Sequence, residues 1–236
     1  MDKFNEVLVN GMKKFSINLT DNQVKKFNTY CQLLIEWNNK MNLTAIKEPQ
    51  EIAIKHFVDS CTVLNYVNIK KNAKIIDIGT GAGFPGIPLK ILRDDLDVTL
   101  LDSLNKRLVF LNEVADKLEI DVKTVHGRAE EFGRKDDYRE NFDVAISRAV
   151  APLNVLSEYC IPFVRNGGKF ISMKGPNVKQ EVDESKKAVK ILGGKYKNIV
   201  QFNIEDNSRS IVIVDKINST PFTYPRHGSK ISKKPL

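Results

Sequence analysis

A turn built from alternating glycines is the part of this chain whose residue types most clearly point to ligand binding. Residues 75–86 read Ile-Ile-Asp-Ile-Gly-Thr-Gly-Ala-Gly-Phe-Pro-Gly, a short apolar strand that runs directly into Gly79, Gly81 and Gly83. Glycine adopts positive φ angles without a steric penalty, and its missing Cβ lets backbone N–H groups approach a ligand. The pattern therefore predicts a site for a small ligand at the end of a strand.

The residues around this turn narrow the type of ligand. Phe84 stands where the dinucleotide fingerprint needs its third glycine, which argues against a nicotinamide cofactor. Asp77 lies two residues before Gly79, and an acidic residue at a strand end followed by Gly-x-Gly-x-Gly resembles the first motif of the S-adenosylmethionine (SAM)-dependent methyltransferases. A plain tight turn or another nucleotide site remains an alternative.

Further candidates follow the next two predicted strands, because ligands of open parallel sheets bind outside the carboxyl ends of the strands. Asp102, followed by Ser103 and Leu104, comes about 20 residues after the glycine turn, where a carboxylate can accept hydrogen bonds from both ribose hydroxyls. The alternative is a helix N-cap supplied by Asp102 or Ser103. After the third strand, the backbone of Ala129 and Glu130 is expected to form hydrogen bonds with the edge of the adenine base. The alternative is that these residues only form a connecting loop.

The residues after the fourth strand, Ser147-Arg148-Ala149-Val150, are expected to lie where the methyl group is transferred. They lack the Asn/Asp/Ser-Pro-Pro-aromatic motif of enzymes that methylate exocyclic amines, and the cysteine used on pyrimidine C5 is missing as well. A purine N7 has a free lone pair and needs neither device. Arg148 is predicted to hold the cofactor or the target base, the alternative being a surface ion pair. Lys174, after the fifth strand, places another cation at the mouth of the cleft.

If the purine is a guanine, methylation at N7 places a chemical restriction on how the protein can recognise it. The common arginine fork onto O6 and N7 would occupy the lone pair that must attack. We therefore expect recognition through O6, N1 and N2, with Arg148 or Asn42 donating to O6. A carboxylate near N1 and N2 would also offset the positive charge that grows on the ring, but the sequence does not indicate which residue supplies it.

The elements that must position these residues follow from hydrophobic periodicity. Apolar residues from Phe4 to Phe15 recur at helical spacing, a second helix opens with a capping box at Thr20 and Gln23, and a third starts at Pro49 and runs to about Tyr66. Strands are expected at 74–78, 98–101, 122–125, 142–146 and 169–173, separated by helical stretches, and a hairpin is expected from 196–202 and 209–215.

The predicted fold is therefore α/β and Rossmann-like: a seven-stranded, mostly parallel sheet with an antiparallel last strand, plus an N-terminal helical module. We divide the chain into that module (residues 1–70), the SAM-binding domain (71–218) and a basic C-terminal loop or tail (219–236).

Composition limits the class of partner and compartment. The chain has 236 residues, a formal net charge of +8 and 42% hydrophobic residues, which favours a polyanionic partner over mere solubility. Cys31, Cys61 and Cys160 are widely spaced, which indicates neither a disulfide framework nor a metal site. We find no signal-peptide or membrane-spanning run, and so expect a cytoplasmic protein that does not bind membranes and acts as a monomer.

Several motifs, taken together and in order, resemble the RsmG family, formerly glucose-inhibited division protein B. They are residues 37–46 (Trp-Asn-Asn-Lys-Met-Asn-Leu-Thr-Ala-Ile), 56–60 (His-Phe-Val-Asp-Ser), 77–86, 127–131, 147–150, 224–226 (Tyr-Pro-Arg) and 233–236 (Lys-Lys-Pro-Leu). The resemblance implies a SAM site at Gly79, Phe84, Ala129, Glu130 and Arg148, and methylation of N7 of the guanine at position 527 of 16S ribosomal RNA. The tail departs from the family's Lys-x-Gly-x-Pro, because this chain has His-Gly-Ser-Lys at 227–230.

The expected RNA surface consists of basic residues that track the phosphate backbone. Its candidates are Lys40, Lys47, Lys55, Lys174, Arg226, Lys230, Lys233 and Lys234. His56 either contacts the substrate or seats the helical module on the sheet, and Trp37 fits the core better than base stacking. Two other functions stay open: a SAM-dependent methyltransferase of a small metabolite, which leaves the basic tail unexplained, and a catalytically inactive Rossmann-like RNA-binding module, which would not bind SAM.

Overall fold

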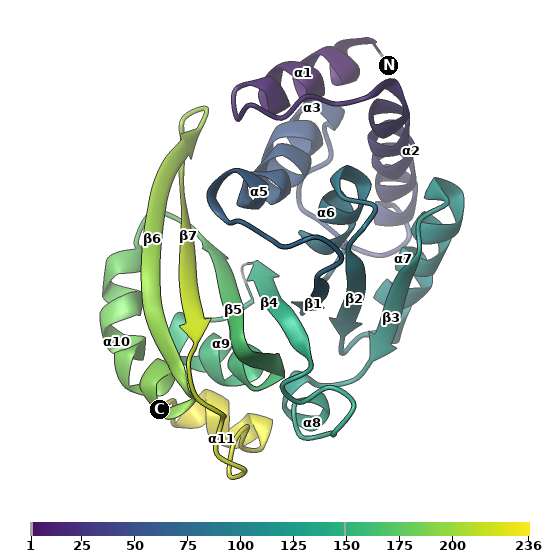
Figure 1. Cartoon of the computed structure of the whole chain (residues 1–236). Helices are drawn as coiled ribbons and strands as arrows, with labels where there is room; N and C mark the ends of the chain where they lie inside the picture. Colours follow the sequence, from purple (N-terminus) through teal and green to yellow (C-terminus); the bar gives the residue numbers. More distant parts are fainter. Residues whose placement is uncertain (1, 149) are drawn as a thin grey trace.

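The protein is built around a seven-stranded sheet (Figure 1). The computed structural model describes residues 2–148 and 150–236, so Ala149 of the predicted methyl-transfer motif lies outside the described residues. The strands are β1 (Lys74–Ile78), β2 (Asp97–Asp102), β3 (Val122–His126), β4 (Phe142–Arg148), β5 (Val164–Lys174), β6 (Gly194–Ile204) and β7 (Asn207–Lys216). Their order is β3-β2-β1-β4-β5-β7-β6, and β7 runs antiparallel to both of its neighbours. The predicted fold class is confirmed, and the hairpin places β7 inside the sheet and β6 at its edge.

Helices cover both faces of the sheet (Figure 1). The strands alternate apolar side chains between two cores: Ile75, for example, joins the core beneath the N-terminal helices, whereas Ile76 joins the core beneath the C-terminal ones. The helices after β1 are α6 (Gly86–Leu92), α7 (Asn105–Leu118), α8 (Ala129–Phe132), α9 (Leu153–Cys160), η2 (Ile161–Phe163), α10 (Val178–Ile191) and α11 (Gly228–Lys233). No helix in the part of the chain that the structure describes has the length and hydropathy needed to cross a membrane.

The N-terminal segment is helical, as its periodicity predicts. It contains α1 (Asp2–Lys13), α2 (Asp21–Asn38), α3 (Pro49–Ile52), η1 (Ala53–Val58), α4 (Asp59–Cys61) and α5 (Val63–Tyr66). Thr20 caps α2 with the expected capping box, and Pro49 begins α3. The predicted third helix contains a π-helical turn over Ala53–Val58, a feature that is frequent at functional sites.

These helices share their apolar core with the sheet. Phe57 of η1 contacts Phe27 of α2 at a ring-centroid distance of 5.1 Å and Phe84 of the glycine turn at 5.9 Å. Because such rings bury large apolar areas in well-defined geometries, they fix the position of η1 relative to the turn. The helix that carries His56 and Asp59 is therefore held rigidly beside the strand ends of the sheet.

The basic C-terminal segment is fastened to the protein rather than free. Arg139 donates to the carbonyl oxygens of Thr220 and Tyr224, at 2.5 Å and 2.8 Å. Arg226 pairs with the fully buried Glu158, with 2.6 Å between its guanidinium and Oε2, and its backbone N–H donates to Oε1 at 2.7 Å. The short helix α11 adds regular structure to a segment expected to be a loop or tail.

Replacing Arg226 with Ala is expected to destabilise the protein by about 3–5 kcal/mol, because a buried carboxylate would lose its charged partner. Urea unfolding followed by circular dichroism measures the change. Lys230→Ala, at an exposed position of the same segment, is the matched control and should change the free energy of unfolding by less than about 0.5 kcal/mol. Equal stability of R226A and the wild type would contradict the structural role of the ion pair.

Candidate active site

A cavity of about 480 Å³ lies at the carboxyl ends of the first four strands. Seven of the predicted cofactor-binding residues line it: Gly79, Gly81, Asp102, Ser103, Ala129, Glu130 and Arg148. Arg107, Arg128, Val150 and Tyr159 complete its polar and apolar surface. The structure thus brings together residues from four separate strand ends, as expected of a parallel sheet.

The glycine turn forms one wall of this cavity. Gly79 and Gly81 have φ angles of +68° and +62°, which an L side chain rarely adopts. A Cβ added at Gly81 would have no protein atom nearer than Gly79 O, 4.0 Å away. The space beside Gly81 is therefore open to a ligand.

Asp77 holds the turn from beneath and does not line the cavity. Its Oδ2 accepts hydrogen bonds from Thr80 Oγ1 at 2.8 Å and from the Gly86 N–H at 2.9 Å. Burial raises the pKa of this carboxyl group to about 6. Oδ1 is buried without a partner in the described part of the chain, so one acceptor remains in the turn.

Asp102 connects the turn to the next strand. Its Oδ2 accepts the Gly81 N–H at 2.9 Å, its Oδ1 accepts the Leu104 N–H at 2.9 Å, and Arg107 lies 3.2 Å from Oδ2. The N-cap of α7 is Leu104 and has no side-chain cap, so the alternative role of Asp102 or Ser103 as N-cap is wrong. Asp102 lines the cavity, at the strand end where the sequence predicts a ribose contact.

Besides Asp77, three of the predicted cofactor contacts lie outside the lining of this cavity. Gly83 is buried against Tyr30, and Leu104 is exposed at the start of α7. The ring of Phe84 is buried and stacks on His56 with 4.6 Å between centroids. Because the Phe84 ring belongs to the core, it is placed to support the site rather than to contact the cofactor.

A second cavity, of about 290 Å³, lies on the other side of Arg148. Its surface combines charged residues from η1 and α4 with apolar residues of the last three strands. The residues are Lys55, His56, Asp59, Arg148, Met173, Lys174, Gly175, Phe202, Arg209, Ser210 and Ile211. Arg148 lines both cavities, so the two spaces adjoin at this residue.

Arg148 is fixed by a hydrogen-bond network. It donates to Asp59 Oδ2 at 3.0 Å, to the Lys55 carbonyl at 3.2 Å and to His56 Nδ1 at 3.1 Å. Its guanidinium carbon lies 4.8 Å from the centroid of the Phe84 ring. Arg148 does form an ion pair, but both side chains are largely buried, so the pair is not the surface contact considered from the sequence.

The same network defines the state of His56. A guanidinium only donates, so Nδ1 must accept from Arg148, and the proton on Nε2 is then donated to Thr44 Oγ1 at 2.8 Å. Burial, together with the nearby charge of Arg148, lowers the pKa of His56 to about 3. His56 is therefore neutral at physiological pH and packs the helix against the sheet, and it also lines the second cavity.

The buried neutral state of His56 predicts acid destabilisation. An unfolded histidine has a pKa of about 6.5, so below that pH protonation favours the unfolded chain. The free energy of unfolding is then lower by about 2 kcal/mol at pH 5. The raised pKa of Asp77 acts in the opposite direction, since its native carboxyl takes up a proton more readily than the unfolded one. The free energy of unfolding of the wild type minus that of His56→Gln, measured from pH 7 to 5, isolates the His56 contribution. A difference independent of pH would contradict a neutral His56.

The remaining predicted contacts are placed as follows. Lys174 pairs with Glu181 at 2.7 Å and donates to the Ala151 carbonyl, which holds the segment after β4. Lys55 pairs with Glu51 and lines the second cavity. Residues that are exposed and line neither cavity are Lys40, Asn42, Lys47, Lys230, Lys233 and Lys234. Arg226 is occupied by Glu158, so its placement does not favour contact with RNA.

Two charged residues of the second cavity, Asp59 and Arg209, have no role in the sequence interpretation. Asp59 is 5% exposed, and its Oδ1 accepts from Arg209 Nε at 3.1 Å. Asp59 follows His56 at a spacing of three on a helix, a signal that could have indicated a shared face. Arg209 is 150 positions away in sequence from Asp59, and nothing local marks it.

Known proteins resemble this chain in sequence and in fold. Residues 23–212 match the model of the family described as rRNA small subunit methyltransferase G. The Ribosomal RNA small subunit methyltransferase G of Acetivibrio thermocellus is 52% identical, covering 99% of this chain and 97% of that protein, and its Clostridium perfringens (strain 13) counterpart is 53% identical over 93% of each. The crystal structure of M. jannaschii TYW2 in complex with AdoMet has a TM-score of 0.51 at 14% identity, over 63% of this chain and 71% of that one, and so agrees in fold. The chain belongs to the rRNA small subunit methyltransferase G family.

Proposed function

We propose that this protein transfers the methyl group of SAM to N7 of the guanine at position 527 of 16S ribosomal RNA. Membership in the methyltransferase G family supports a SAM-dependent enzyme that acts on small-subunit rRNA. The observation that carries the proposal is the junction of two cavities at Arg148. A methyl donor and an acceptor base need adjoining spaces that meet at one point.

The first cavity offers polar groups suited to SAM. The open space beside Gly81 accommodates the close approach of a ligand, and Asp102 supplies a carboxylate to the ribose hydroxyls. Ala129 and Glu130 are proposed to flank the adenine, and Asp77 to keep the glycine turn in shape. The sulfonium of bound SAM would supply an activated methyl group. The chain's task is to hold that group in line with its acceptor.

The reaction at N7 requires no base. The N7 lone pair forms the new N–C bond while the C–S bond breaks and its electron pair stays on sulfur, so no proton leaves the nitrogen. His56 is neutral and has both ring nitrogens engaged, and Cys160 is buried in α9, which agrees with a mechanism without a protein base or nucleophile. Orientation of two bound reactants supplies about 7–11 kcal/mol of barrier reduction.

The RNA would be held by exposed cations around the two cavities. We propose Lys40, Lys47, Lys230, Lys233 and Lys234 as phosphate contacts, with Lys55 nearer the target base. Lys174 fits better as a residue that positions the segment after β4, and Arg226 as an anchor of the tail. We further propose a monomeric enzyme that acts in the cytoplasm, with residues 1–70 and 219–236 as RNA-binding additions to the methyltransferase domain.

Incubation of the protein with labelled SAM and 16S rRNA that lacks the modification tests the proposal. We expect one labelled nucleotide, guanine 527, whose N7 methylation makes the chain cleavable by borohydride and aniline at that site. Label on another nucleotide, on a different atom or on no RNA would overturn it. Labelling of a small metabolite instead would favour the alternative class of methyltransferase.

A further inference from the structure

The second cavity contains a carboxylate whose hydrogen-bonding capacity is only half used. Asp59 is buried, and in the described part of the chain each of its oxygens accepts one side-chain hydrogen bond, Oδ2 from Arg148 at 3.0 Å and Oδ1 from Arg209 at 3.1 Å. A carboxylate has about four lone-pair sites. One acceptor site therefore remains on each oxygen, and these two sites match a ligand that presents two adjacent N–H donors.

The walls of this cavity suit a flat ring. Met173, Phe202 and Ile211 supply apolar and aromatic surface, and Lys55 and Arg209 add cations at its margin. A base removed from a single-stranded loop is recognised by such surfaces, which contact its faces, together with polar groups directed at its edge.

The order of the polar groups matches one edge of guanine. Along that edge guanine presents the N2 amino group, N1–H, O6 and then N7. The protein presents Asp59, then Arg148 in direct contact with it, and then the cofactor cavity, which Arg148 also lines. With the acceptor oxygens of Asp59 on N1 and N2 and the guanidinium of Arg148 on O6, N7 faces the methyl donor and stays free of hydrogen bonds.

We propose that the cavity between η1 and the β5, β6 and β7 strands receives the target guanine, and that Asp59 reads its N1–H and N2 amino groups. The assignment rests on the proposed function and names the residue that selects the acceptor. The charge of Asp59 also opposes the positive charge that the ring gains on methylation. Arg209 acts through Asp59, because its contact with Oδ1 keeps the carboxylate oriented.

The proposal is tested by changing the base and the carboxylate together. The substrates are 16S rRNA assembled by ligation with either guanosine or inosine at position 527, since inosine keeps N7, O6 and N1–H but lacks the N2 amino group. The wild type should prefer guanosine in kcat/KM by about tenfold or more, because one charge-assisted hydrogen bond is lost with inosine. In Asp59→Asn this ratio should fall to below about threefold, since an amide cannot accept both donors.

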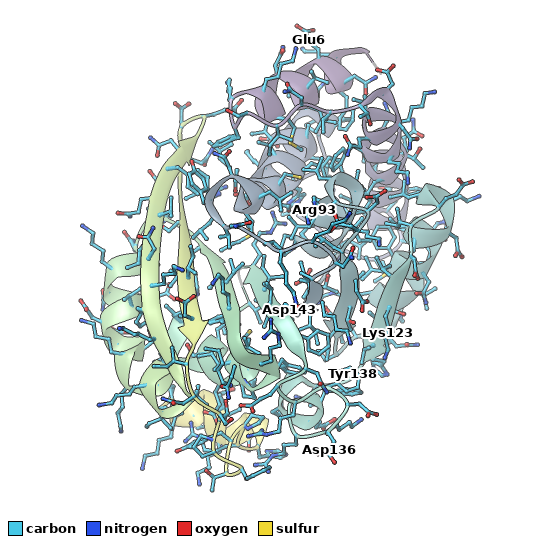
Figure 2. The ribbon with its side chains drawn as sticks, in the orientation of Figure 1. Glu6, Arg93, Lys123, Asp136, Tyr138 and Asp143 are labelled. Atoms are coloured by element: carbon cyan, nitrogen blue, oxygen red, sulfur yellow. The ribbon has the colours of Figure 1, made fainter. Side chains whose placement is uncertain are left out.

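Asp143→Asn is the matched control. Asp143, labelled in Figure 2, is likewise a largely buried carboxylate that pairs with an arginine, 2.6 Å from Arg165, but it lies at the beginning of β4, the strand that ends at Arg148. D143N should retain the wild-type ratio whatever it costs in stability. Circular dichroism and SAM binding establish that each variant is folded.

The outcomes are separable. Equal rates of the wild type on guanosine and inosine RNA would overturn the assignment without any variant, and so would a D59N enzyme that keeps the full preference. Failure of the wild type to methylate the guanosine RNA at N7 would instead overturn the proposed function, on which the assignment depends.

Discussion

Replacing Arg148 with Ala is expected to lower kcat for methyl transfer by about 10²–10³-fold, the usual cost of removing one preorganised donor. Arg148 lies between the two cavities and supplies the cation that stands next to Asp59. Without it, the acceptor base loses its orientation toward the methyl donor, and Asp59 retains one cationic partner, Arg209. Single-turnover kinetics with saturating SAM and RNA measure the effect on the chemical step.

Arg107→Ala is the control for this loss. Arg107 lines the cofactor cavity only, where it pairs with Asp102 at 3.2 Å. We expect this variant to raise the KM for SAM and to leave kcat within about threefold of the wild type. This is the result when a lost contact stabilises the bound ground state and the transition state equally. A similar kcat for R148A and the wild type would sink the catalytic assignment of Arg148.

A methyl group added at Gly81 is expected to weaken SAM binding at least tenfold, which corresponds to about 1.4 kcal/mol. The new Cβ would meet no protein atom within 4.0 Å and would project into the space assigned to the cofactor. The positive φ of Gly81 adds a cost of about 1–2 kcal/mol to folding, which must be separated from the loss of binding.

Gly167→Ala makes that separation. Gly167 has a φ of +80°, and an added Cβ there would come no nearer than 3.8 Å to a protein atom, but the residue belongs to β5 and lines neither cavity. Both variants should lose thermal stability to a similar degree, whereas G167A should retain wild-type affinity for SAM in isothermal titration calorimetry. Unaltered SAM affinity in G81A would show that the glycine turn does not border the cofactor.

Local sequence patterns predict the part of the site that lies at the ends of the parallel strands. Gly79 and Gly81 lie in the turn after β1, and Asp102 and Arg148 are the last residues of β2 and β4. The parallel topology makes those strand ends converge. The strand β1 begins and ends at the predicted residues, and its end is marked by Gly79, which follows the β-branched run. Sequence alone does not decide the role of Phe84, since a residue next to a ligand turn can point into the core as readily as out of it.

The other half of the site depends on tertiary packing. Asp59 and Arg209 meet only because β7 turns back between β5 and β6, which brings the beginning of an antiparallel strand to the edge where the parallel strands end. No periodicity encodes that placement. In the same way, the sequence around Arg226 indicates a cation that is free to contact RNA. Only the fold places the buried Glu158 beside it. The division into residues 1–70, 71–218 and 219–236 stays a prediction.

The position of the β6–β7 hairpin near the C-terminus also sets the order in which the parts of the site are synthesised. Every residue that lines the proposed cofactor cavity lies between positions 78 and 159, whereas the lining of the proposed acceptor cavity also includes Phe202, Arg209 and Ile211. During synthesis from the N-terminus, all parts of the donor site exist before the acceptor site is complete. The cavity proposed to select the acceptor is therefore completed last, when the hairpin joins the sheet.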